Sequence, residues 1–165
     1  MEDWQINFLT GALTLIGVII TAVISVITVK REIYSRRVIE ERTKWLLKFR
    51  EHLGDFMSAF ELKRERNKGR CHLKFNGTEY NDLMIKGENA RFQMISMLNT
   101  STVKGNEYNF YLKERLFEMT LFKSIKRSEF IKKFDEEYVK NFMNCCNLML
   151  EQVWQESKRE SRYGR

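Results

Sequence analysis

A dense run of cationic side chains near the middle of the chain is the strongest candidate for chemistry. It contains Arg64, Arg66, Lys68, Arg70, His72 and Lys74, follows Lys63 and includes one carboxylate, Glu65. Guanidinium groups make paired, charge-assisted hydrogen bonds with phosphate oxygens, and Phe75 or Tyr80 could stack on a nucleobase. The run therefore predicts a binding site for an anionic, phosphate-bearing ligand. The alternative is a solvated charge run, in which cations at a helix end offset the negative pole of the helix dipole.

Residues suited to metal binding or catalysis are few. The chain has two histidines and three cysteines, and it lacks a glycine-rich phosphate-binding motif. Cys71 and His72 supply only two of the four ligands that a structural zinc site needs. Cys145-Cys146 lies in a helical pattern, where core packing is the ordinary role, and free thiols are expected in a reducing compartment. We therefore expect no metal, no cofactor and no enzymatic activity.

The run from Phe8 to Val29 contains 22 residues without a charge and ends at Lys30-Arg31. A helix needs about 20 apolar residues to cross a bilayer. Glu2 and Asp3 precede the run and no small-residue cleavage site follows it, which favours a retained anchor over a cleaved signal peptide or a buried core helix. All Lys and Arg lie at or after Lys30, so we expect the N-terminus outside, with Trp4 at the interface, and residues 30–165 in the cytoplasm.

One narrow face of this apolar segment carries small and polar side chains at helical spacing. The face, which we call the stripe, consists of Asn7, Thr10, Thr14, Gly17, Thr21, Ser25 and Thr28. Small residues let two helix backbones approach, and hydroxyls bond across such an interface, so the stripe predicts self-association into a homo-oligomer. Two versions remain open: the stripe lines a pore, or the hydroxyls bond to their own helix backbone and the face only packs.

The remaining chain is basic and reads as helical. Residues 30–165 contain all 29 Lys and Arg residues and 20 of the 22 Asp and Glu residues, so their net charge is +9. The chain has no proline, and the apolar spacing predicts a juxtamembrane amphipathic helix over 30–66. Further helices are expected over 80–98 and 107–126, and a last one runs from Ser128 as the N-cap to about 157. Loops are expected at 67–78 and 99–106, and the first loop contains a short strand over 71–75.

These elements predict an all-α protein with one transmembrane helix and a bundle of about four cytoplasmic helices. The expected divisions are 1–29 for the extracytoplasmic end and anchor, 30–66 for the juxtamembrane helix, and 67–165 for a domain packed on it. A basic surface beneath a bilayer has two natural partners, anionic lipid and nucleotides or nucleic acid, and charge alone does not separate them.

The whole chain resembles a broad group of small bacterial membrane proteins, and this resemblance implies a location in the bacterial inner membrane. The likeness rests on the juxtamembrane helix Glu41 to Arg50, the helix end Met97-Leu98-Asn99, and the terminal Leu150-Glu151, Trp154 and Lys158-Arg159-Glu160. Its layout is also similar to the membrane effectors of type III CRISPR systems. That resemblance implies antiviral defence by an oligomer that binds cyclic oligoadenylate, in particular cyclic tetra-adenylate, and then perturbs the membrane.

Two alternatives accompany this hypothesis. One is a membrane-anchored scaffolding protein whose juxtamembrane charges meet anionic lipid. The other is a ribonuclease, because Arg66-Asn67 followed by His72 resembles the Arg-x4-6-His signature of the helical HEPN ribonucleases, in which the Arg and the His act together on the scissile phosphate.

Overall fold

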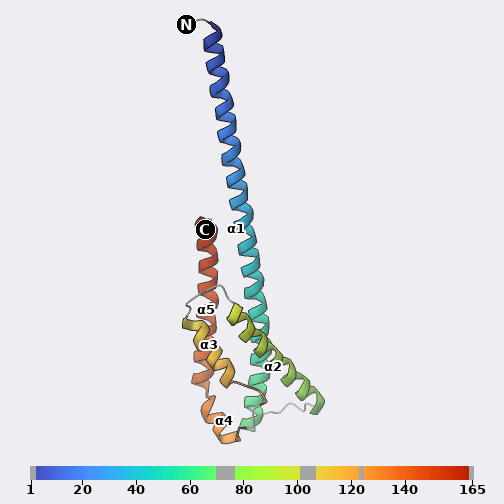
Figure 1. Ribbon diagram of the computed structural model, residues 1–165. Helices are drawn as coiled ribbons and strands as arrows, with labels where there is room; N and C mark the ends of the chain where they lie inside the picture. Colours follow the sequence, from blue (N-terminus) through green and yellow to red (C-terminus); the bar gives the residue numbers. More distant parts are fainter. Residues whose placement is uncertain (1–2, 70–76, 101–106, 123–124, 164–165) are drawn as a thin grey trace. The chain divides into compact units, whose positions relative to one another are not determined.

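The computed structural model describes residues 3–69, 77–100, 107–122 and 125–163, and within these ranges all regular structure is helical. The helices are α1 (Asp3–Lys68), α2 (Gly77–Thr100), α3 (Glu107–Glu118), α4 (Arg127–Lys133) and α5 (Glu136–Tyr163) (Figure 1). The prediction of an all-α protein is confirmed, with five helices. The strand expected at 71–75 lies outside the described residues.

The chain divides into two compact units. Unit 1 comprises Met1–Glu41 and Ser157–Arg165, and unit 2 comprises Arg42–Glu156. Helices α1 and α5 contribute residues to both units. The structural division on α1 thus falls after Glu41, whereas the sequence-based divisions fall after residues 29 and 66.

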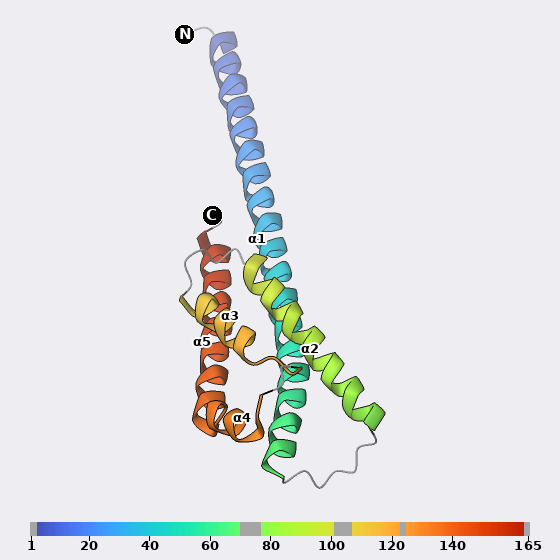
Figure 2. The ribbon, with the colours of Figure 1, turned by 60° about the horizontal axis from the view of Figure 1, so that its bottom comes forward.

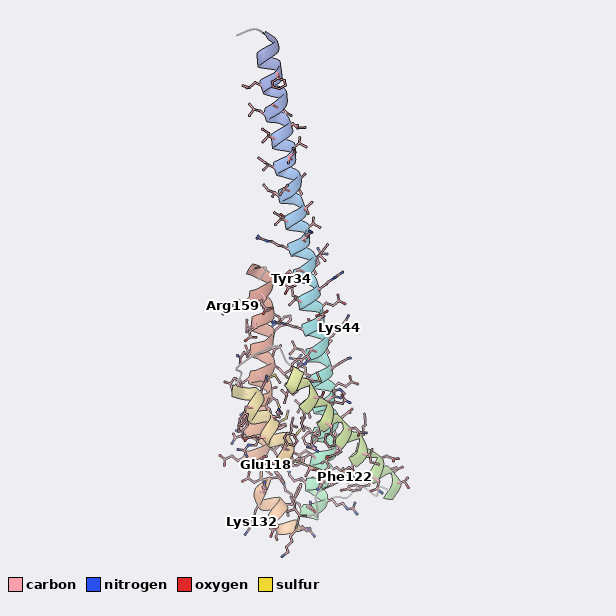
Figure 3. All side chains as sticks on the ribbon, viewed as in Figure 1. Tyr34, Lys44, Glu118, Phe122, Lys132 and Arg159 are labelled. Atoms are coloured by element: carbon pink, nitrogen blue, oxygen red, sulfur yellow. The ribbon has the colours of Figure 1, made fainter. Side chains whose placement is uncertain are left out.

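Unit 1 contains the apolar segment of α1. By length and composition α1 is able to cross a membrane, and its most apolar stretch buries none of its residues. Large side chains from Phe8 to Val29 are exposed, between 47% for Ile27 and 74% for Phe8. Figure 3 shows side chains projecting to both sides of the N-terminal part of α1. Exposed apolar surface of this extent marks a membrane or protein contact, and the length fits a membrane span.

Unit 2 is organised around the pairing of α1 with α5. Buried residues on α1 fall at positions 46, 49, 53, 56 and 60, and on α5 at 139, 142, 146, 149 and 153, so both helices follow alternating spacings of three and four. The helices lie side by side and antiparallel within this unit (Figures 1 and 2). Phe56 meets Phe142 with ring centroids 6.5 Å apart, while Arg64, further along α1, reaches back to Glu136.

The shorter helices complete the core of unit 2. Aromatic rings hold helix α4 in place. The ring centroid of Phe60 on α1 lies 5.7 Å from that of Phe130 and 5.4 Å from that of Phe134, the C-cap of α4. Helix α2 approaches α1 at Gly87, where an added Cβ would collide with the Cβ of Ala59 and come within 2.9 Å of Leu121. Only glycine therefore permits this crossing.

Two sequence-based boundaries are wrong. Helix α3 ends at Glu118 rather than near 126, and the expected fourth helix is two helices, α4 and α5. Ser128 does not cap α4, whose N-cap is Lys126 without a side-chain bond. A side chain caps α5 instead: the carboxylate of Asp135, the residue before this helix, accepts a 2.7 Å hydrogen bond from the Tyr138 amide. The break itself lies at Phe134, the C-cap of α4, whose ψ of 57° is not helical, and the Asp135 cap then starts α5.

Gly87→Ala tests the α1–α2 crossing. We expect a loss of about 1–3 kcal/mol in the free energy of unfolding, the usual cost of overpacking a core. Gly54→Ala is the matched control, because Gly54 lies in α1 with open space around its would-be Cβ. That change should raise stability by about 0.5–1 kcal/mol through helix propensity. Urea unfolding of the full chain, followed by circular dichroism, measures both, and equal effects would contradict the close crossing.

Candidate functional site

The cationic run begins on the last turns of α1, where two of its members bind carboxylates of the protein itself. Arg64 is buried, with its Nε 3.1 Å from Glu61 and a terminal nitrogen 4.0 Å from Glu136. Lys68 Nζ lies 3.4 Å from Glu65 and 3.5 Å from the same Glu136 oxygen. Arg64 and Lys68 thus join α1 to the start of α5, and their charges are largely neutralised.

Arg66 differs from these two neighbours. It is exposed, and its guanidinium lies over the ring of Tyr80 on α2, 4.2 Å from the centroid. Among the described residues it has no carboxylate partner. A guanidinium fixed on an aromatic face keeps its outward edge for phosphate oxygens, so Arg66 is the described member of the run best placed to bind an anion.

The helix end beside Arg66 has a defined geometry. Gly69 adopts a φ of 74°, the left-handed conformation that ends helices, and its amide donates to the Arg66 carbonyl over 3.1 Å. The Nε of Arg127 donates to the Asn67 carbonyl. A Cβ on Gly69 would lie 2.6 Å from that guanidinium. Arg127 therefore satisfies a terminal carbonyl and adds a cation that the sequence analysis did not assign to this region.

Arg70, His72 and Lys74 lie outside the described residues, as do Cys71 and Phe75. The anion-binding prediction therefore rests on Arg66 among the described members of the run. The pairing of an Arg and a His for ribonuclease chemistry likewise stays a prediction, because one of its two residues is not described. Replacing His72 with Ala would separate that alternative from the others.

A buried ionic network occupies the centre of unit 2. Glu88 on α2 accepts hydrogen bonds from Arg91 (2.6 Å), the Leu121 amide (3.0 Å) and the Thr120 hydroxyl (3.1 Å). Arg91 also donates to the Leu116 carbonyl over 2.9 Å. Both charged side chains are buried, at 8% and 4% exposure. With its acceptors filled from within the protein, this network is structural rather than a ligand site.

Electrostatics agree with a structural role for the network. Burial disfavours the charged form of Glu88, but the Arg91 hydrogen bond, the Leu121 amide and the Arg91 charge outweigh it and hold the pKa of Glu88 below its ordinary value. Lys63 donates to the Leu121 carbonyl over 2.5 Å. Burial lowers the pKa of Lys63, an effect that the charge of Glu88 partly offsets.

A second polar cluster joins α3, α4 and α5. The carboxylate of Glu118 accepts from the Tyr138 hydroxyl at 2.8 Å and from Arg115 at 3.0 Å, and Lys133 lies 3.6 Å away. The Tyr138 hydrogen bond is the main cause that lowers the pKa of Glu118, whereas burial raises the pKa of Tyr138. At neutral pH the phenol stays protonated and the carboxylate stays charged. The cluster is therefore a fixed structural contact between the three helices rather than a proton-transfer site.

The stripe on the apolar segment uses its hydroxyls locally. Thr14 donates to the Thr10 carbonyl, Thr21 to the Gly17 carbonyl and Thr28 to the Ile24 carbonyl, over 2.8 to 2.9 Å. A Cβ added at Gly17 would meet open space. The side chain of Asn7 lies outside those described. These bonds match the packing version of the stripe, in which the hydroxyls serve their own backbone and leave a shallow, small-residue face.

The described cysteines and potential metal ligands show no feature of a redox or metal site. Cys145 and Cys146 are free and buried, and burial raises the pKa of both thiols, which keeps them protonated. Within the described ranges, no group of three or more His, Cys, Asp or Glu side chains is placed to hold a metal ion.

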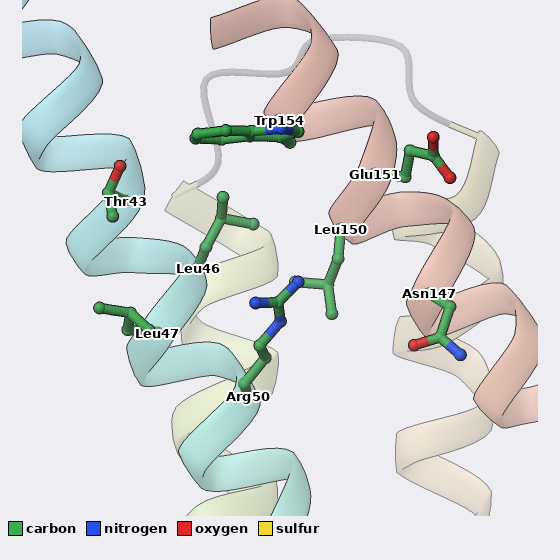
Figure 4. Close-up of a pocket in the computed structure, with 8 residues that line it drawn as sticks. All are labelled: Thr43, Leu46, Leu47, Arg50, Asn147, Leu150, Glu151 and Trp154. Atoms are coloured by element: carbon green, nitrogen blue, oxygen red, sulfur yellow. The ribbon is translucent and has the colours of Figure 1, made fainter.

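A groove of about 550 Å³ between α1 and α5 of unit 2 was not anticipated from the sequence (Figure 4). It is lined by Thr43, Leu46, Leu47, Arg50, Asn147, Leu150, Glu151 and Trp154. Arg50 and Trp154 each follow a core residue in the sequence, Phe49 and Val153. The apolar spacing of either helix therefore predicts them to be ordinary surface residues. Their meeting depends on the antiparallel register of α1 and α5, for which the sequence carries no local signal.

Comparison of the chain with protein-family models, with curated proteins and with solved structures gives no match. The class that the structure defines is therefore an all-α protein with one long, apolar N-terminal helix that could span a membrane.

Glu88→Gln tests the buried network. Removing the charge leaves Arg91 buried without its counter-ion, and we expect a loss of about 3 kcal/mol in unfolding free energy at pH 7. Because the folded pKa of Glu88 lies below its ordinary value of 4.5, its contribution is present above that pH and disappears as the pH falls through the folded pKa. The difference between wild type and variant should therefore shrink in acid.

Urea midpoints at pH 7 and pH 3.5 measure this effect. Lys86→Gln serves as the control, because it removes the exposed 2.8 Å pair that Lys86, two residues before Glu88 on α2, makes with Asp55 on α1. Exposed pairs contribute little, so this variant should stay close to wild type at both pH values. A Glu88→Gln variant that behaves like Lys86→Gln would show that the network is dispensable.

Proposed function

We propose that the protein is a single-pass effector of a bacterial inner membrane that senses an anionic nucleotide. The N-terminus faces outward, the basic unit 2 faces the cytoplasm and binds cyclic oligoadenylate as an oligomer, and the apolar segments then associate and perturb the membrane in antiviral defence. This proposal combines the distribution of charge along the chain with the residues that α1 carries.

The observation that carries the proposal is the composition of α1. One helix, Asp3–Lys68, contains the apolar segment, the stripe, the core-forming face of unit 2 and Arg66. No loop is inserted between these parts. A ligand that brings copies of unit 2 together would thereby bring their apolar segments together, provided that it binds the assembled arrangement better than the separate one.

The nucleotide is inferred from charge and from the Arg66–Tyr80 pair. Residues 30–165 carry a net charge of +9, which attracts polyanions to the cytoplasmic side. Arg66 offers a guanidinium beside an aromatic ring, the combination that holds a phosphate next to a stacked base. A cyclic ligand with repeated nucleotides also suits a symmetric oligomer.

Arg66→Gln tests the ligand site. Wild type in nanodiscs of neutral lipid should bind cyclic tetra-adenylate saturably, and the variant should bind about tenfold more weakly because a charge-assisted contact is lost. Arg37→Gln is the control, since Arg37 is an exposed cation on the same helix and outside unit 2. Isothermal titration at two salt concentrations measures both. Absence of saturable binding to wild type would refute the sensor function.

The stripe is tested by dye release from liposomes. The triple change Thr14→Leu, Thr21→Leu and Ser25→Leu fills the small-residue face, and we expect it to abolish release triggered by cyclic tetra-adenylate. The control changes Ile16, Val23 and Ile27 to Leu, which places three Leu residues on the opposite side of the helix. Unchanged release in the stripe variant would exclude the stripe from the mechanism.

A scaffolding role is the second candidate, and a specific observation favours it. Arg64 and Lys68 are engaged by Glu61, Glu65 and Glu136, which leaves fewer cations of the run for a nucleotide. Lys30, Arg31 and Arg37 are exposed and follow the apolar segment, as expected for contacts with anionic lipid. Under this alternative, binding to anionic liposomes falls steeply with salt and no cyclic nucleotide binds saturably.

A further inference from the structure

We infer that the groove between α1 and α5 binds an anionic amphiphile, a molecule with a carboxylate or phosphate head and an acyl body. The groove lies entirely within unit 2 and shares no residue with the cationic run. The inference therefore does not depend on the proposed nucleotide site. Its volume of about 550 Å³ falls in the range of small-molecule sites.

The walls of the groove are apolar. Leu46 on α1 and Leu150 on α5 are buried at 5% and 4% exposure and form its base, whereas Leu47 and Trp154 are 58% and 39% exposed beside it. Leu47 and Trp154 thus offer an acyl chain apolar surface that is otherwise left to water, next to the buried pair. Burying such a chain against them is favoured by the hydrophobic effect.

Arg50 supplies the charge that selects an anion. In Figure 4 its guanidinium extends between Leu46 and Leu150 toward the indole of Trp154. Within the described part of the chain, Arg50 has no carboxylate partner, although Arg64, Arg91 and Arg115 of the same unit each have one. A guanidinium that enters an apolar groove without a counter-ion is complementary to a carboxylate or phosphate head.

The remaining polar groups favour an acyl body over a nucleobase. Recognition of a base needs hydrogen bonds to its edge in addition to stacking. Asn147 and Glu151 carry the groups suited to that task, but Figure 4 shows both projecting from α5 away from Arg50 and Trp154. What the groove presents beside Arg50 is hydrocarbon and an indole face, which matches an acyl chain.

The test uses fluorescence quenching in the full chain. The chain has three tryptophans, so the double change Trp4→Phe and Trp45→Phe leaves Trp154 as the only indole. Trp45 tolerates this change because its buried Nε1 has no hydrogen-bond partner and its ring stacks on Phe49 at 5.3 Å, which a phenyl ring can also do. The probe is bromododecanoate, whose bromine quenches an indole that it contacts, with the protein in phosphatidylcholine nanodiscs.

We expect saturable quenching of Trp154. Arg50→Gln should weaken the apparent affinity about tenfold, since it removes the charge but keeps a polar side chain. Lys48→Gln is the matched control, an exposed cation two positions away that does not line the groove, and should leave the affinity unchanged. Leu47→Glu, at an exposed position, should also abolish saturable quenching by placing a carboxylate at the opening.

Several outcomes overturn the inference. Quenching that rises linearly without saturation would mean partition into the bilayer alone, and equal affinities in Arg50→Gln and Lys48→Gln would remove the anion contact. Bromododecanol, which lacks the charge, must bind more weakly than bromododecanoate and must not respond to Arg50→Gln. Circular dichroism establishes that each variant is folded. A folded Leu47→Glu variant with undiminished affinity would also refute the site.

Competition distinguishes the source of the ligand from the proposed function. Displacement of the probe by soluble dodecyl phosphate or by phosphatidylglycerol in the disc supports the inference and identifies a free or a bilayer source. Displacement by cyclic tetra-adenylate would overturn the amphiphile assignment and move the nucleotide site to this groove. Saturable probe binding without any response to cyclic tetra-adenylate would support the groove while the sensor function fails.

Discussion

The folded unit depends on the point where α2 crosses α1. Gly87 lets the two backbones approach, and the adjacent Glu88 accepts three hydrogen bonds, two of them from Thr120 and Leu121 in the segment after α3. Arg91, one turn further along α2, donates a hydrogen bond to the Leu116 carbonyl near the end of α3. A buried carboxylate is stable only when its acceptors are filled, so this arrangement fixes where α3 ends and how the chain continues toward α4. Helix propensity alone would have continued α3 further.

The α1–α5 pair gives unit 2 its length and creates its groove. Apolar residues at spacings of three and four on both helices bury a continuous seam from Phe60 to Leu46. At the Leu46 end the facing side chains leave a hollow between Arg50 and Trp154, whereas at the other end Arg64 and Lys68 close the pair with Glu136. One end of the pair is therefore closed by intramolecular charge pairs and the other presents an unpaired guanidinium.

The cations of this basic chain consequently fall into two groups. Arg64, Lys68 and Arg91 bind carboxylates of the protein and stabilise the fold. Arg66 on Tyr80 and Arg50 in the groove lack such partners among the described residues. Net charge, which counts both groups equally, overstates how much of the surface is available to an anionic ligand. Partner assignments based on charge must therefore start from the unpaired cations.

The sequence by itself determined the helical class, the apolar segment and most core positions, because each is encoded in local periodicity. The alternating spacings from Leu46 to Phe60 and from Phe142 to Val153 specify buried faces whatever the neighbours are. Tertiary structure alone decided that α3 ends at Glu118, that Asp135 rather than Ser128 caps a helix, and that Arg64 is paired while Arg66 is not. It also brought Arg50 to Trp154, more than a hundred residues away. These features arise from contacts between helices, whose register depends on the shape of the whole core and leaves no periodic trace in the chain.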